Sequence, residues 1–198
     1  DKRDCDFETC KGIADFFAGI VDYKSEFTGK HSLGVAKKAA ELAEYMGYSQ
    51  ADIEKFYMAG ALHDIGKMAI GNEILEKPGR LTDEEFSRMK NHAGYTYMIL
   101  SEVKDFDEVR DWAALHHEKL DGTGYPFGKK AEELNEPERL MACVDIYQAL
   151  TEARPYKSGM SHDKACSILE DMVQKGWIDA AVTDKLRSCF DVGGRDMV

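Results

Sequence analysis

Residues 49–67 read SQADIEKFYMAGALHDIGK, and this stretch joins a strong helical signal to a histidine-aspartate pair. Ser49, with Asp52 three residues later, is a helix start signal. The Ala, Met, Tyr and Leu residues that follow predict a helix over about 50–64. The stretch therefore predicts a largely apolar helix that ends at two side chains able to bind a metal ion.

The His-Asp pair at the end of this helix has a geometry that suits a cation. Successive residues of a helix point about 100° apart, so His63 and Asp64 can reach one ion at the helix flank from two sides. Lys67 lies one turn further along the same side. A single His-Asp dipeptide is weak evidence, because it occurs by chance in many proteins.

Apolar residues recur at three- and four-residue steps through almost the whole chain, which is the period of amphipathic helices. We find no run with the two-residue alternation of a strand and no internal repeat. The sequence therefore predicts an all-α protein, a single helical bundle with a long loop that contains GYP. Helices are predicted over about 11–24, 30–47, 50–64, 83–101, 105–116, 137–152, 161–175 and 178–190.

The composition excludes several classes of protein. The 198 residues carry 37 acids against 26 bases, a net charge of −11, so we expect no binding to nucleic acid. No apolar run approaches the roughly 18–20 residues that span a bilayer, so no membrane segment is expected. The five cysteines are scattered without a CxxC motif, which favours neither a disulfide framework nor a Cys-based zinc site. We expect a cytoplasmic protein, and a start without Met or a signal peptide indicates a piece of a longer chain.

Histidines and aspartates form a larger set of candidate ligands. Asp145 lies within the apolar run RLMACVDIYQAL, where an acid is costly to bury unless it is paired or bound to a cation. Each member alone has an ordinary explanation, because a lone histidine is most often exposed or hydrogen-bonded within a core. We give His162 this ordinary explanation and do not count it among the ligands. Seven donors together are too many for one tetrahedral ion but suit two ions with a bridging carboxylate. These donors are His31, His63, Asp64, His92, His116, His117 and Asp145.

Imidazole and carboxylate ligands without thiolate favour iron, manganese, nickel or zinc. If the substrate is a phosphodiester, as the family resemblance described next implies, two such ions close together can polarise it and hold a bridging hydroxide for attack on phosphorus. In that case Lys67 can stabilise charge on the phosphoryl oxygens, and Arg154 can clamp a phosphate with two hydrogen bonds. A local cationic site of this kind would let an acidic protein bind an anionic substrate.

At this point the sequence closely resembles the HD-GYP branch of the HD phosphohydrolase superfamily. The resemblance covers about residues 25–190 and keeps the order and spacing of separate motifs. The motifs are HSLGVA (31–36), LHDIGK (62–67), ILEKPGRLTDEEF (74–86), NHAG (91–94), HHEKLDGTGYP (116–126), VDIYQAL (144–150) and RPYK (154–157).

The resemblance implies a helical, metal-dependent phosphodiesterase that converts cyclic di-GMP to pGpG and then GMP, with iron or manganese as the expected metal. It implies a first metal site at His31, His63, Asp64 and Asp145. A second site would be completed by His92, His116 and His117. Asp64 would be the ligand that bridges the two ions, and Asp64 and Lys67 would be the catalytic residues. The residues directed at the dinucleotide would be Lys67, Tyr125, Arg154 and Lys157.

Some positions depart from the family pattern. Phe27 stands where some members have a carboxylate that holds a third metal, so two metals are expected, although Glu26 is only one residue away. Gly71 stands where a proline is usual, and Gln148 where an acid is common. Neither is a predicted ligand, but both can alter loop placement and substrate choice.

The resemblance also implies a division of the chain and a set of partners. Residues 1–24 are expected to be a lead-in helix, the end of a linker from an upstream sensory or receiver domain, and 25–198 the catalytic domain. A homodimer is compatible with this organisation. Two alternatives stay open: an inactive module that binds a cyclic dinucleotide or a partner protein, and a phosphodiesterase of the same fold for another cyclic dinucleotide or nucleotide.

Overall fold

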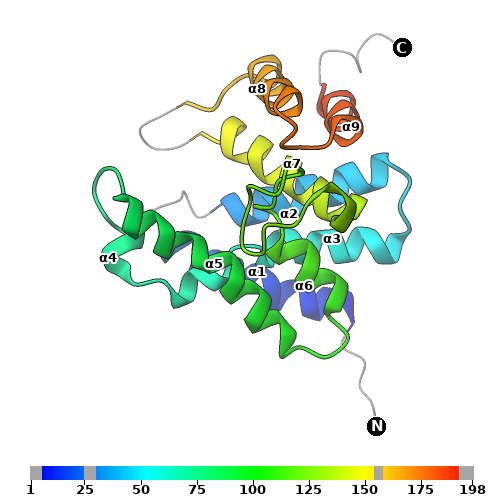
Figure 1. Ribbon diagram of the computed structural model, residues 1–198. Coiled ribbons are helices and arrows are strands. Elements are labelled where there is room, and N and C mark those ends of the chain that lie inside the picture. Colours follow the sequence, from blue (N-terminus) through cyan, green and yellow to red (C-terminus); the bar gives the residue numbers. More distant parts are fainter. Residues whose placement is uncertain (1–5, 25–29, 154–157, 192–198) are drawn as a thin grey trace.

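The computed structural model describes residues 6–24, 30–153 and 158–191, and the regular elements in these residues are all helical (Figure 1). The one pairing of strand type among them is an isolated bridge between Asp121 and Lys130. The predicted all-α fold is thereby confirmed. The α-helices are α1 (Phe7–Lys24), α2 (His31–Tyr45), α3 (Gln50–Leu62), α4 (Asn72–Leu75), α5 (Asp83–Ser101), α6 (Asp107–Ala114), α7 (Glu136–Thr151), α8 (His162–Gln174) and α9 (Ala180–Phe190), and the 3-10 helices are η1 (Ile65–Ala69) and η2 (Ala131–Glu133).

Helices α2 and α3 pack closely against each other at the centre of the molecule. Gly60 of α3 faces the backbone of α2, where an added Cβ would lie 2.6 Å from the Cα of Ala36. Ala39 and Ala43 are fully buried on the same side of α2. Small side chains at this contact let the two helix axes approach more closely than larger residues would.

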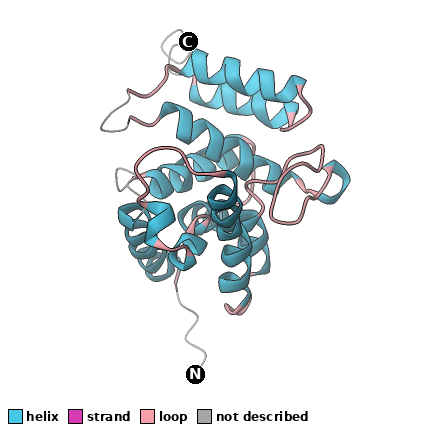
Figure 2. Cartoon of the chain, turned by 60° about the vertical axis from the view of Figure 1, so that its left-hand side comes forward, coloured by secondary structure: helices cyan, strands magenta, loops and turns pink. Residues whose placement is uncertain are grey.

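Helix α7 lies across this pair and is buried along much of its length. Asn135 caps it, since its side chain accepts a hydrogen bond from the backbone N–H of Glu138. The Glu138 carboxylate bonds back to the Asn135 N–H and completes a capping box. Helices α8 and α9 lie side by side beyond α7 and form the outermost layer (Figure 2).

The opposite side of the core is covered by α1, α5 and α6. Trp112 of α6 stacks on Phe56 of α3 with ring centroids 4.4 Å apart, which joins α6 to the central pair. Ala14, Ala18 and Val21 of α1 are buried in the same core. Helix α5 begins at a capping box between Thr82 and Glu85, as its sequence predicts.

The predicted helices correspond to observed ones, but some of their bounds differ. The helix predicted over 11–24 already begins at Phe7, and two other helices end earlier than predicted. The helix predicted to 64 ends at Leu62, and the helix predicted over 105–116 covers only Asp107–Ala114. In both cases the last predicted turn is replaced by residues that turn toward the histidine cluster. No helix in the described part of the chain combines the length and the apolar character needed to cross a bilayer.

Candidate metal centre

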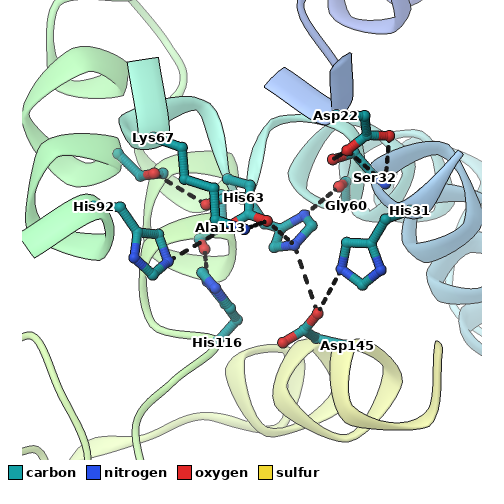
Figure 3. Close-up of polar contacts among 12 residues, drawn as sticks. Asp22, His31, Ser32, Gly60, His63, Lys67, His92, Ala113, His116 and Asp145 are labelled. Carbon is teal, nitrogen blue, oxygen red and sulfur yellow. Dashed lines mark hydrogen bonds and ion pairs between the residues drawn. The ribbon is translucent and has the colours of Figure 1, made fainter. Parts of the chain in front are cut away.

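Six of the seven predicted ligands are buried at a meeting point of helices, and their side chains converge there (Figure 3). The seventh, His117, is half-buried beside them. Helix α2 supplies His31 from its first turn, and α7 supplies Asp145 from its middle. The other ligands come from the end of α3, from α5 and from the segment that follows α6.

The sequence predicts that His63 and Asp64 lie on one continuous helix, but the structure has a break there. His63 is the last residue of helical conformation at the end of α3, and Asp64 has φ −100° and ψ 7° ahead of η1. Thr96 of α5 holds this break, because its hydroxyl accepts from the N–H of Gly66 (3.0 Å) and donates to the carbonyl of His63 (3.0 Å). The break turns the Asp64 carboxylate into the cluster.

Three of the histidines are oriented by the same local contact. The Nδ1 atoms of His63, His92 and His116 lie 2.6–2.7 Å from the backbone carbonyl three residues earlier. A carbonyl can only accept, so each Nδ1 carries a proton and each Nε2 is directed to the centre. This arrangement, with the outer nitrogen fixed by a carbonyl, is typical of metal-binding histidines.

The Nε2 atoms of the clustered histidines indicate whether a cation fits between them. Within the described residues, Nε2 of His92 and Nε2 of His116 are buried without a hydrogen-bond partner. Buried acceptors of this kind are costly unless something satisfies them. Groups of ligand atoms no more than 4.8 Å apart are formed by His92, His116 and His117, by His31, His63 and Asp64, and by His63, His116 and Asp145. The donors and their spacing therefore fit metal ions.

Asp64 lies between the two halves of the cluster. Its Oδ2 is 3.3 Å from Nε2 of His63, and its Oδ1 is 3.3 Å from Nε2 of His92. One carboxylate oxygen thus faces each half, which is the arrangement that a bridging ligand requires. Lys67 Nζ also contacts Oδ2 at 2.6 Å, so a cation lies at the edge of the centre.

On the other side, His31 is held between two carboxylates. Its Nε2 lies 3.1 Å from Asp145 Oδ1 and its Nδ1 lies 2.9 Å from Glu152 Oε2. The sequence reasoning missed Glu152 as a partner of a ligand. Its position carried a usable signal, since it follows Asp145 by seven residues, or two helical turns, and so lies on the same side of α7.

The electrostatics divide the centre into an acidic half and a neutral half. Burial opposes the charged form of every member, yet hydrogen bonds to Asp145 and Glu152 raise the pKa of His31 to about 10. Burial lowers the pKa of His117 to about 4 and that of His116 well below its ordinary value. Burial works against ionisation of Asp64 too, but Lys67 and His63 hold its pKa well below the usual range. For Asp64, His116 and His117 these shifts favour the ionised carboxylate and the neutral imidazoles that ligate metals, whereas His31 would have to release a proton to bind an ion.

The loop that follows the paired histidines is fixed against the cluster. Tyr125 packs on His117 with ring centroids 4.7 Å apart. Glu118 is buried and accepts three backbone hydrogen bonds, from the N–H groups of Phe127 (2.7 Å), Gly128 (3.1 Å) and Lys129 (3.0 Å). The loop cannot carry a side chain at Gly124, where a Cβ would lie 2.4 Å from the Lys119 nitrogen.

Three other positions singled out in the sequence lie within the described residues. His162, which the sequence did not count among the ligands, has its Nδ1 2.8 Å from the Tyr147 hydroxyl oxygen. Gln148 is buried against α2, where it fills the space beside Gly34. Gly71 is the N-cap residue that precedes α4, and it lies close to the Glu73 side chain. Glu26, Phe27, Arg154 and Lys157 lie outside the described residues.

Comparison with known proteins agrees with this geometry. A family profile described as HD domain matches residues 15–182. The chain belongs to the HD domain family. The resemblance to its HD-GYP branch is confirmed as well, because the relatives below carry cyclic dinucleotide phosphodiesterase names.

Two curated relatives come from Vibrio cholerae. The 3'3'-cGAMP-specific phosphodiesterase 1 is 38% identical over 177 residues, which is 89% of this chain and 41% of the relative. A cyclic di-GMP phosphodiesterase is 40% identical over 167 residues, which is 77% of this chain and 34% of the relative. The chain thus spans well under half the length of either relative.

A solved structure shares the fold. Bd1817 of Bdellovibrio bacteriovorus, described as an HDG"Y"P protein, superposes with a TM-score of 0.66 over 94% of this chain and 65% of that one. Its sequence identity is 17%, so this likeness concerns the fold alone.

Proposed function

We propose that this HD domain is a metal-dependent phosphodiesterase that hydrolyses cyclic dinucleotides, with cyclic di-GMP as its substrate and pGpG and GMP as products. The observation that carries the proposal is the pair of buried Nε2 atoms of His92 and His116, which have no hydrogen-bond partner among the described residues and lie in a cluster whose Asp64 carboxylate faces both halves. The names of the relatives support the substrate class.

In this proposal seven residues hold two metal ions, which we expect to be iron or manganese. Asp64 would contact both ions. The first ion would also be held by His31, His63 and Asp145, and the second by His92, His116 and His117. Metal ions bound here would polarise the phosphodiester and make a water molecule acidic enough to attack near neutral pH.

The remaining side chains would bind and orient the substrate. Lys67 reaches Asp64 from the rim of the cluster with a side chain that is 12% exposed, so its ammonium group can also neutralise charge on a phosphoryl oxygen. The Tyr125 ring forms a wall beside His117, and burial raises the pKa of its hydroxyl, so it acts as a neutral donor. Arg154 and Lys157 remain proposed phosphate ligands.

A second candidate is a preference for 3'3'-cGAMP, because a relative with that name covers more of this chain than the cyclic di-GMP enzyme does. Both dinucleotides share a guanosine half and a phosphodiester ring, so the cluster itself does not separate them. A module that binds the dinucleotide without cleaving it is a weaker candidate. Such a module does not need a complete set of metal ligands, whereas here every predicted ligand in the described residues lies at the cluster.

The test is to purify the chain without oxygen, load it with iron or manganese, and measure metal per chain. Cyclic di-GMP, 3'3'-cGAMP and cyclic di-AMP are then followed by chromatography under identical conditions. We expect two metals per chain, release of pGpG and GMP, and loss of turnover by at least 1000-fold in Asp64→Asn. Asp184→Asn, an exposed carboxylate on α9, is the matched control and should keep full activity.

A fully metallated wild-type chain that leaves cyclic di-GMP intact but cleaves 3'3'-cGAMP would replace the first candidate with the second. A metallated chain that binds all three without cleaving any of them would establish the binding module.

A further inference from the structure

The outer face of α1 carries a stripe of exposed apolar side chains. Ile13 is 53% exposed, Phe16 66%, Ile20 36% and Tyr23 88%. They follow one another at steps of three, four and three residues, which is the spacing of the contact positions in a coiled coil. The opposite side of the same helix already packs in the core through Ala14, Ala18 and Val21. Helix α1 is therefore apolar on two sides, and only one side has a partner in the described structure.

A groove of about 640 Å³ runs beside this stripe, and it is lined by α1, the second half of α3, η1, the last turn of α5 and the segment after α5. None of the described residues that line it is charged, and they include Ile13, Phe17, Leu62, Met68, Ile99 and Val103. Three of these are also open to solvent: Met68 is 42% exposed, Ile99 36% and Val103 46%. Stripe and groove together form one continuous apolar surface, which we call the α1–α5 face.

The size of this face is that of an interface between proteins. Its exposed side chains amount to on the order of 700 Å², and a stable interface buries about 800 Å² on each partner. The largest apolar patch on a typical monomer is roughly 300–600 Å². Leaving this face in water would therefore be unusual for a monomer.

We propose that the α1–α5 face binds a second copy of this chain, with the two α1 helices packed along their stripes. The coiled-coil spacing calls for a helix as the partner, and the same chain supplies one with the matching spacing. A two-fold arrangement would place the two stripes against each other and bring each α1 helix beside the groove of the other copy. Gly12 and Gly19 flank the stripe, and an added Cβ at either would meet nothing within 4 Å, so a second backbone can come close.

The distribution of charge also favours a second copy of the chain as the partner of the α1–α5 face. Each copy carries a net charge of −11, so two copies repel each other over most of their surface. The groove is lined by uncharged side chains, and the stripe consists of Ile, Phe and Tyr. Two copies can therefore meet here without burying an unpaired acid.

The proposed interface is connected to the metal centre through Asp22. This residue of α1 is buried, and its carboxylate accepts from the backbone N–H (3.0 Å) and the hydroxyl (2.6 Å) of Ser32 (Figure 3). Ser32 follows the ligand His31 in the first turn of α2. A change in how α1 packs would reach His31 through this pair of hydrogen bonds.

Sedimentation velocity of the wild-type chain between about 1 and 200 μM tests the proposal directly. We expect a reversible dimer. Phe16→Glu with Ile20→Glu places two acids in the stripe of each copy and should raise the dimer dissociation constant at least 100-fold. Tyr45→Glu, on the exposed end of α2, is the matched control and should dimerise like the wild type. A wild-type chain that stays monomeric over the whole range overturns the proposal, and so does a double variant that dimerises as tightly as the wild type.

A second measurement needs no variant and decides the case if the double substitution prevents folding. Amide hydrogen exchange of the wild-type chain is compared at low and high concentration. Slower exchange in α1 and the second half of α5 at high concentration, with α8 unchanged, supports the proposal. A dimer that protects another face and leaves α1 unchanged overturns it.

Discussion

Asp64 occupies the central position of the cluster because a short local break changes its direction. On a continuous helix its carboxylate would project about 100° away from His63. At the junction of α3 and η1 it instead reaches His63, His92 and Lys67 at once. A backbone break of one residue thus decides whether two halves of a metal site can share a ligand.

Glu118 has an equally local role in the loop beside the cluster, and it is buried while it satisfies three backbone N–H groups. In Glu118→Gln one acceptor oxygen becomes an NH₂ group that faces these donors. We expect the free energy of unfolding to fall by about 1–3 kcal/mol, because buried backbone donors lose their partner. Tyr125 would lose its fixed place, so KM for the cyclic dinucleotide should rise about tenfold while metal content stays the same.

Steady-state kinetics, metal analysis and amide exchange over 119–130 measure these effects. Glu132→Gln, an exposed acid in the same loop, is the control and should behave as the wild type. Unchanged exchange and KM in Glu118→Gln would contradict this role.

At the residue scale, much of the candidate site could be predicted, because its ligands are recognised by their residue type and by their neighbours in the sequence. Histidines beside acids, and an acid in an apolar helix, are visible in a sequence without any coordinates. Glu152 could not be separated from other acids in this way, because it bonds to His31, 121 residues earlier in the chain. The role of Glu118 could not be predicted either, since its hydrogen-bond partners depend on how the loop returns.

At the scale of elements, the contact between η1 and α5 sets the shape of the centre. Gly66 lies so close to α5 that an added Cβ would be 1.9 Å from the carbonyl oxygen of His92 and 2.5 Å from the nitrogen of Thr96. These are backbone atoms of a long helix, which cannot move aside easily.

We therefore expect Gly66→Ala to destabilise the chain by about 3 kcal/mol or more and to lower metal content. Gly94→Ala is the matched control in α5. Its Cβ would meet only Pro126 at 3.9 Å, so the substitution should stay within about 1 kcal/mol of the wild type. Urea unfolding and metal analysis of both variants give the comparison, and equal stability of the two would show that η1 can move away from α5.

The start of α9 offers a prediction with a defined pH dependence. Asp179 caps α9 through the N–H of Val182 (3.0 Å) and pairs with Arg139 of α7 (2.8 Å). Burial acts against its charge, but these contacts lower the pKa of Asp179 overall. Asp179→Ala should lose about 1–2 kcal/mol of unfolding free energy, whereas Asp179→Asn keeps the cap and loses only the ion pair.

The sign of the pH effect follows from the lowered pKa. The carboxylate stabilises the fold above its unfolded pKa near 3.8, and this contribution is lost as the pH falls through the lower folded value. The gap between wild type and Asp179→Asn in urea unfolding should therefore be constant at pH 6–7 and shrink as the pH approaches and passes 3.8. A gap that does not change with pH would mean that the ion pair contributes nothing.

A helix start that carries a capping residue could be predicted well. Ser49 acts within one turn of the chain and is observed as the cap of α3. The ends of α3 and α6 depend on where His63 and His116 must point, which is a property of the assembled centre. The predicted boundary between 24 and 25 has no such marker and stays a prediction.

At the scale of the whole molecule, the cluster joins several layers at one point. Its ligands come from α2, the α3–η1 junction, α5, the segment after α6, and α7, whereas α8 and α9 contribute none among the described residues. A bound ion would therefore connect the central pair to both covering layers. Unfolding would have to release it, which links metal binding to global stability.

We expect metal loading to raise the melting temperature of the chain. A metal at a hundredfold excess over its dissociation constant adds about 2.7 kcal/mol, and for a chain of this length that corresponds to a rise of roughly 5–10 °C. Calorimetry of chelated and manganese-loaded protein measures the shift, and Asp64→Asn should lose most of it because it lacks the shared ligand. Amide exchange should slow at the start of α2 and over 63–67 on loading, while the α8–α9 pair exchanges as before. A melting temperature that is the same with and without metal would mean that these ligands do not hold an ion, and the catalytic proposal would fall with it.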